Sequence, residues 1–80
     1  MKKICSLCDI NPGEKALVKH IGTHGAMRRR LQDIGLIPDT EVECVGRSPG
    51  KNPAAYLIRG AVIAIRNEDC KDVLVLPIEV

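Results

Sequence analysis

The most constraining feature of this sequence is that its apolar runs are short and are interrupted by turn-forming residues. Turn-forming residues that include Pro or Gly lie at residues 11–13, 37–39, 48–53 and 59–60. Short runs rich in Val and Ile between such breaks are typical of β-strands. The two-residue break at Arg59-Gly60 favours a tight hairpin. We therefore expect strands at residues 14–21, 40–46, 54–58, 61–65 and 73–76.

The alternation of side chains within these runs predicts which of them face the core. In residues 40–46, Val42 and Cys44 share one face, and the opposite face carries Glu41, Glu43 and Val45. In residues 14–21, we expect Leu17 and Ile21 to face the core. The polar residues interleaved with them are Lys15, Lys19 and His20, which suits a strand with one buried and one solvent-exposed face.

One segment, residues 25–34, has a helical pattern. Its apolar residues Met27, Leu31 and Ile34 recur at the spacing of one helix face. Gly35 is expected to cap the end of this helix, and Thr23 or His24 lies near its beginning. A further single turn is expected at residues 67–72, before the last strand.

Size and composition narrow the fold class. A chain of 80 residues is expected to form one domain over residues 1–80. With one Tyr and no Phe or Trp, its core must be built from aliphatic side chains. Five short strands around one helix are too few for two packed sheets of ordinary size. The sequence therefore predicts a mainly β fold, a small and partly open β-barrel with one inserted helix.

The sequence lacks a secretory signal and any apolar stretch long enough to span a membrane. We therefore expect a cytoplasmic protein that does not insert into a membrane. In that compartment the four cysteines are expected to be reduced thiols. Cys44 and Cys70 have no other cysteine nearby in the sequence. Isolated cysteines of this kind usually act as small buried apolar residues.

Cys5 and Cys8 have the C-x-x-C spacing that can hold a metal ion or form a redox pair. A closed metal site needs about four ligands. His20 and His24 could complete one, but they fall on a predicted strand and in a loop. The other interpretation is that the cysteines are incidental, while Leu7 and Ile10 anchor this segment to the core. The turn residues that follow Cys8 do not favour redox catalysis.

Arg28, Arg29 and Arg30 form the most pronounced charged feature. On a helix, Arg28 and Arg29 point away from the apolar face, and Arg30 flanks it. Nucleic-acid binding is not expected, because the net charge is only +2 and aromatic residues for base stacking are missing. The sequence also contains no phosphate-binding loop, nucleophile elbow or zinc-protease motif. We therefore do not expect an enzyme.

The order of motifs resembles that of the FeoA family, ferrous iron transport protein A. The resemblance covers about residues 7–76, and its most specific part is Arg30-Leu31 followed by Ile34-Gly35-Leu36 and Pro38. It implies an SH3-like barrel with an inserted helix. It also implies an accessory role for the ferrous iron transporter FeoB, a membrane protein with a cytosolic GTP-binding domain. The Cys5–Cys8 pair is not a feature we associate with the family.

The interpretation that follows is a cytosolic adaptor that docks on FeoB and modulates transport or complex assembly. We expect its partner-binding residues around the helix: Gly22, Gly25, Met27, Arg28, Arg29, Arg30, Leu31, Gly35, Leu36 and Pro38. Leu36 and Ile37 either contact the partner or pack back on the helix. The alternative function is a transition-metal carrier or sensor, for iron or zinc, that uses Cys5 and Cys8. A third hypothesis is self-association through an open edge of the barrel.

The family usually has Pro-Gly where this chain has Pro38-Asp39. We expect a type I turn there, in which Asp39 accepts a local hydrogen bond, instead of a type II turn with glycine.

Overall fold

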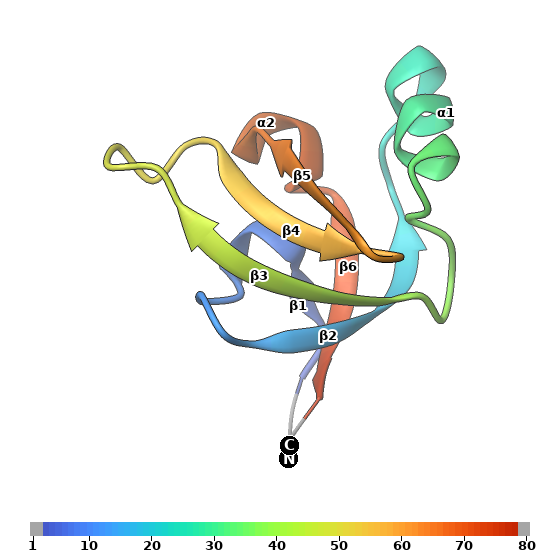
Figure 1. Ribbon diagram of the computed structural model, residues 1–80. Helices are drawn as coiled ribbons and strands as arrows, with labels where there is room; N and C mark the ends of the chain where they lie inside the picture. Colours follow the sequence, from blue (N-terminus) through green and yellow to red (C-terminus); the bar gives the residue numbers. More distant parts are fainter. Residues whose placement is uncertain (1–2, 79–80) are drawn as a thin grey trace.

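The computed structural model describes residues 3–78 and contains a single curled antiparallel sheet (Figure 1). The strand order is β1-β6-β2-β3-β4-β5. The strands are β1 (Cys5–Ser6), β2 (Lys15–Ile21), β3 (Glu41–Arg47), β4 (Ala54–Ile58), β5 (Ala61–Ile65) and β6 (Val73–Ile78). The helices are the short 3-10 turn η1 (Leu7–Asp9), α1 (Gly25–Asp33) and α2 (Asn67–Cys70).

All five predicted strands, the helix and the single turn are present, and the fold is mainly β as expected. The structure adds β1, whose two residues pair with β6 through Cys5–Val75 and Ser6–Leu74. A strand of two residues is too short to show any periodicity, so no sequence pattern could indicate it. The last strand also extends beyond its predicted end, to Ile78.

The predicted core face of β2 was wrong at Leu17. Ala16 and Val18 are fully buried there, while Leu17 is only partly buried. The cause is an irregularity in the pairing with β6 between Val18 and His20, which adds one residue to β2. This bulge reverses the alternation, so Ile21 is buried as predicted although Leu17 is not. In β3, Val42 and Cys44 face the core as predicted.

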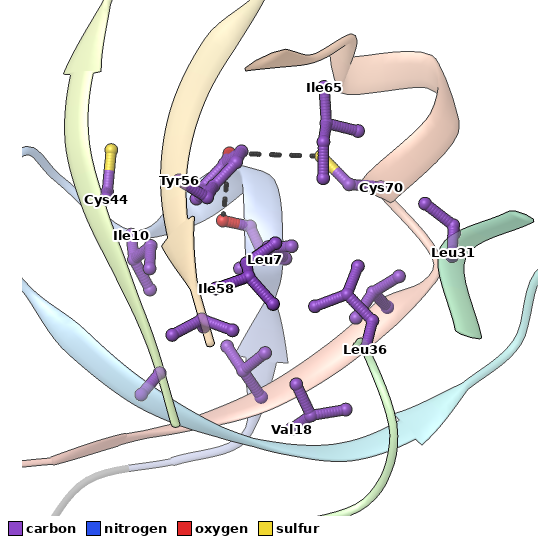
Figure 2. Packing of buried hydrophobic residues seen from close by; sticks show 14 of the residues in the cluster. Leu7, Ile10, Val18, Leu31, Leu36, Cys44, Tyr56, Ile58, Ile65 and Cys70 are labelled. Atoms are coloured by element: carbon purple, nitrogen blue, oxygen red, sulfur yellow. Dashed lines mark hydrogen bonds between the residues drawn. The ribbon is translucent and has the colours of Figure 1, made fainter. Parts of the chain in front are cut away.

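The core is almost entirely aliphatic and lies inside the curl of the sheet (Figure 2). It takes side chains from every strand except β1, and from η1, α1 and α2. Leu7 and Ile10 anchor the amino-terminal segment, and Cys44 and Cys70 are buried, as predicted. The buried residues are Leu7, Ile10, Ala16, Val18, Ile21, Leu31, Leu36, Val42, Cys44, Ala54, Tyr56, Ile58, Ile65, Cys70, Val73 and Val75.

Tyr56, the single aromatic residue, fills the middle of this core with no exposed surface. Its hydroxyl donates to the carbonyl oxygen of Leu7 at 3.4 Å and lies 3.9 Å from the Cys70 Sγ (Figure 2). A buried hydroxyl needs such a partner because desolvation without one is costly. Tyr56 therefore connects β4 to η1 and α2.

Arg47, at the end of β3, forms a second connection to the amino-terminal segment, through hydrogen bonds to its backbone. Its Nη2 donates to the carbonyl oxygens of Cys8 at 2.6 Å and of Ile10 at 2.7 Å. The Cys8 carbonyl belongs to η1 and the Ile10 carbonyl to its C-cap, and backbone acceptors at a helix end have no partner within the helix. One guanidinium thus satisfies both. The sequence contained no signal for this contact, because it depends on how the sheet curls.

The end of α1 is a Schellman motif centred on Gly35, which confirms the predicted cap. The Gly35 N–H donates to the Gln32 carbonyl and the Leu36 N–H to the Leu31 carbonyl, both at 3.0 Å. Gly35 has a φ of 111°. Leu36 is fully buried and joins Leu31 in the core. Of the two interpretations of Leu36, the structure therefore selects packing against the helix.

The beginning of α1 is capped less well. His24 occupies the N-cap position as expected, but its side chain makes no capping hydrogen bond. The first helical residue, Gly25, has a φ of 68°, which a residue with a side chain adopts at a cost.

The turn at Pro38-Asp39 differs from the prediction. Asp39 has a φ of 71°, and the Thr40 N–H donates to the Ile37 carbonyl at 3.1 Å. Pro at the second position and positive φ at the third are features of a type II turn. Asp39 thus occupies the conformation that glycine usually takes, and its carboxylate pairs with the Lys19 Nζ at 3.4 Å. Aspartate tolerates the left-handed region better than most residues do, which allows this substitution.

We predict that Gly35→Ala lowers the free energy of unfolding by about 1–3 kcal/mol. A Cβ at this position would meet the Arg59 Cδ at 2.8 Å and the Ile58 Cγ2 at 3.2 Å, in addition to the strain of positive φ. Gly25→Ala is the matched control, since its φ is also positive but no atom lies within 4 Å of the added Cβ. Urea unfolding of both variants should show the larger loss for Gly35→Ala. Equal losses would contradict a packing role for Gly35.

We also predict that the stability of the fold decreases above pH 9. Burial raises the pKa of Cys70 from 9.0 to about 11, and burial with the nearby Cys70 thiol raises the pKa of Tyr56 above its usual value of 10.0. At pH values between a group's ordinary pKa and its raised pKa in the folded protein, the unfolded chain loses a proton that the folded chain keeps. Each group therefore lowers the free energy of unfolding by at most about 1.4 kcal/mol per pH unit.

Urea unfolding at pH 8 and pH 10 tests this prediction. Cys70→Ala should make the decrease smaller. Val73→Ala, which also truncates a fully buried side chain but removes no ionisable group, should leave the decrease unchanged. Equal pH dependence in the wild type and Cys70→Ala would contradict the assignment.

Candidate functional site

A groove between α1 and β5 is the candidate site. It encloses about 340 Å³ and is lined by residues from α1, β5 and the segment that begins α2. Figure 1 shows that α1 lies beside the sheet, near the end of β2 and the turn between β4 and β5. The lining residues are Met27, Arg30, Leu31, Ile34, Ile63, Ala64, Ile65, Arg66 and Asp69.

The two long walls of this groove are apolar. Met27, Leu31 and Ile34 form the predicted apolar face of α1, and Ile63 and Ile65 come from β5. Leu31 and Ile65 are buried, whereas Met27, Ile34 and Ile63 are only partly covered. Half-buried apolar side chains in a concave surface gain from contact with another apolar surface. The groove therefore has the character of a binding surface.

The charges at the groove are mainly positive. Arg30 and Arg66 are exposed at its border, together with one carboxylate, that of Asp69. Within residues 3–78, the single ion pair is Lys19–Asp39, so neither arginine is neutralised by a carboxylate of the described chain. Arg30 lies beside the apolar face as predicted. An acidic ligand would find two free guanidinium groups here.

The predicted partner-binding residues occupy different places. Met27, Arg30 and Leu31 line the groove. Arg28 and Arg29 are exposed elsewhere on α1, and Arg28 Nη1 donates to the Ile21 carbonyl at 3.3 Å.

The remaining predicted residues have structural positions, in a backbone contact, in the core or in a turn. The Gly22 N–H donates to the Asp72 carbonyl at 2.8 Å, and a Cβ on Gly22 would lie 3.1 Å from that oxygen. The close approach that this glycine permits is thus to its own chain. Gly35 and Leu36 are buried and present no side chain to a partner. Pro38 is exposed in the type II turn.

Cys5 and Cys8 lie near η1 and pack partly against the core. Burial, and then the nearby carboxylates of Asp9 and Glu14, raise the pKa of Cys5, which disfavours its thiolate. The Ser6 hydroxyl lies 3.1 Å from the Cys8 Sγ and donates to the Lys71 carbonyl at 2.6 Å. No group of three or more His, Cys, Asp or Glu side chains within residues 3–78 is arranged to hold a metal ion. The structure does not bring His20 and His24 together with the cysteines.

Sequence reasoning missed the contributions of β5 and of the α2 segment to the groove. Ile63, Ala64 and Ile65 were expected only as a strand, and Arg66 and Asp69 were given no role. The alternation of β5 is visible in the sequence, but its place at the edge of the sheet is not, because that depends on strand order. Ile34 was recognised on the helix face and is the one added residue that the pattern itself could have indicated.

Within the described part of the chain, neither helix is long and apolar enough to cross a membrane.

Comparison with known proteins gives a consistent result. The family model FeoA domain matches residues 5–77. No curated protein sequence matches significantly. Among solved structures, a FeoA-like protein from Clostridium acetobutylicum is 31% identical with a TM-score of 0.83, covering 94% of this chain and 87% of that one.

Two further FeoA structures resemble this chain. FeoA from Stenotrophomonas maltophilia, described as an SH3 domain protein and solved with zinc, is 26% identical with a TM-score of 0.78; the match covers 88% of this chain and 87% of that one. FeoA from Chlorobium tepidum is 23% identical with a TM-score of 0.86, covering 92% and 70% of the two chains. The SH3-like fold predicted from the resemblance is thereby confirmed, and the chain belongs to the FeoA family.

Proposed function

We propose that this protein is a cytoplasmic, non-enzymatic accessory of ferrous iron uptake that docks on the transporter FeoB through the α1–β5 groove. Membership of the FeoA family supports the iron-uptake role. A FeoA relative is described as an iron uptake regulatory protein, and the S. maltophilia protein has been put forward as a ferrous iron transport activating factor. The observation that carries the docking proposal is the half-open apolar groove bordered by unneutralised arginines.

The groove and the helix arginines have separate parts in docking. Apolar contacts made by Met27, Ile34 and Ile63 hold the bound partner, so they act mainly on dissociation. Arg28 and Arg29, exposed on other sides of α1, attract acidic surface over a longer range and act mainly on association. Docking then modulates transport or the assembly of the transport complex. Gly22, Gly25, Gly35, Leu36 and Pro38 contribute by fixing the position of α1.

We predict that Met27→Glu weakens binding to the cytosolic domains of FeoB at least tenfold, which corresponds to about 1.4 kcal/mol. The reason is that docking would bury the new carboxylate in the apolar wall. Isothermal titration calorimetry with the purified full-length protein measures the affinity, and thermal unfolding checks that the variant is folded.

Arg29→Glu should slow association and reduce its dependence on salt.

Lys51→Glu is the matched control for Arg29→Glu. It makes the same change of charge at an exposed lysine in the β3–β4 loop, on the far side of the molecule from α1 (Figure 1). Its binding should stay close to that of the wild type.

The double change Cys5→Ser, Cys8→Ser should leave ferrous iron uptake by cells intact. Uptake that fails with the cysteine change and survives Met27→Glu would contradict docking and favour the metal carrier.

A further inference from the structure

The outer edge of β5 is open along the groove. β5 pairs with β4 alone, through Ala61–Ile58, Ile63–Tyr56 and Ile65–Ala54 with the residues between them. The connecting loop has only two residues, Arg59 and Gly60, and both have positive φ. In such a hairpin the residues next to the loop form a hydrogen-bonded pair, and every second pair after it does the same.

This alternation fixes which backbone groups are free. Ala61, Ile63 and Ile65 bond to β4, so the N–H and C=O groups of Val62 and Ala64 point away from it. Within residues 3–78, no hydrogen bond other than the β4–β5 ladder involves a residue of β5. Val62 is 64% exposed, and Ala64 is exposed and lines the groove. The free groups of Ala64 therefore face the groove.

β5 also lacks the features by which natural proteins protect an edge strand. Such strands are usually very short, or carry Lys, Pro or a bulge. The other edge strand of this sheet, β1, has two residues, whereas β5 has five, all apolar, in regular register. An edge of this kind can accept another strand, with backbone hydrogen bonds giving affinity and the groove receiving alternate side chains.

The charges around β5 indicate what kind of strand fits. Arg59 precedes β5 and Arg66 follows it, and Arg30 lies across the groove. If two copies of this chain paired through β5 in antiparallel fashion, their arginines would share one edge and repel. A segment with carboxylates on either side of an apolar stretch would instead place them near Arg59 and Arg66, which flank β5, with Arg30 across the groove.

We infer that β5 takes up an extended segment of its partner as an added strand, and that this segment is apolar with acidic flanks. The inference rests on the proposed function only in taking FeoB as the protein that supplies the segment. It specifies the docking mode: backbone pairing at Val62 and Ala64, apolar side chains between α1 and β5, and carboxylates near Arg59 and Arg66 at the two ends of β5.

Amide hydrogen exchange by NMR tests this inference with the full-length protein and the cytosolic domains of FeoB. In the free protein, the amide of Ala64 should exchange at least tenfold faster than that of Ile63, which is bonded to β4. At saturating partner, the exchange of Ala64 should slow at least tenfold. A complex that forms without protection of Val62 or Ala64 would overturn strand addition and leave docking intact.

Ala64→Pro provides a second test. It removes the outward N–H without removing a bond to β4, a position at which edge strands tolerate proline. We expect at least a tenfold loss of affinity. Ala64→Thr, which keeps the N–H, should bind within about threefold of the wild type. Equal binding by the two variants, with both folded by thermal unfolding, would overturn the inference.

If the wild type does not bind FeoB, the proposed function fails, and a designed peptide then decides the inference. The probe is Glu-Val-Thr-Val-Thr-Val-Glu, with Lys-Val-Thr-Val-Thr-Val-Lys as its control. Protection of Ala64 by the acidic peptide and not by the basic one would support an acidic-flanked strand from another partner. No protection by the acidic peptide at millimolar concentration would overturn it.

Discussion

The cap at the end of α1 is the constraint on which the candidate site depends. Because Gly35 has no side chain, the stem of Arg59 and the side chain of Ile58 can lie against its backbone. The same glycine turns the chain so that Leu36 enters the core beside Leu31. The helix is thereby fixed against the β4–β5 hairpin, and its apolar face is placed opposite β5. This contact joins the two walls of the groove at the end of α1, in addition to the core that Leu31 and Ile65 share.

The core shows how a small domain is built with one aromatic residue. Tyr56 lies where residues from β4, η1 and α2 meet, and its hydroxyl is accommodated by the Leu7 carbonyl and the Cys70 thiol. Small and β-branched side chains fill the remaining space. On the apolar face of α1, Met27 and Ile34 pack against this core but are only partly covered. The molecule thus combines a closed core with a half-open apolar groove on one side.

Local patterns predicted most of the elements but not their arrangement. The strands, the helix and its glycine cap follow from alternation, helical spacing and turn residues, which act over a few positions. Leu17 was misplaced because a bulge in β2 depends on its pairing with β6. The type II turn at Asp39 was missed because aspartate can adopt either turn. The contribution of β5 to the site could not be foreseen, since its edge position arises only when all six strands assemble.

Arg47 has a consequence for the way the molecule opens. A single guanidinium holds the carbonyls of Cys8 and Ile10, while Leu7 and Ile10 cover the Tyr56 side of the core. The amino-terminal segment is thus held by these two hydrogen bonds and two buried side chains, in addition to the pairing of β1 with β6. Detachment of this segment would expose the Tyr56 side of the core, where Cys70 lies, to water and thiol reagents. Arg47 therefore helps to keep the Cys70 thiol away from solvent, although it lies on a strand that does not carry this cysteine.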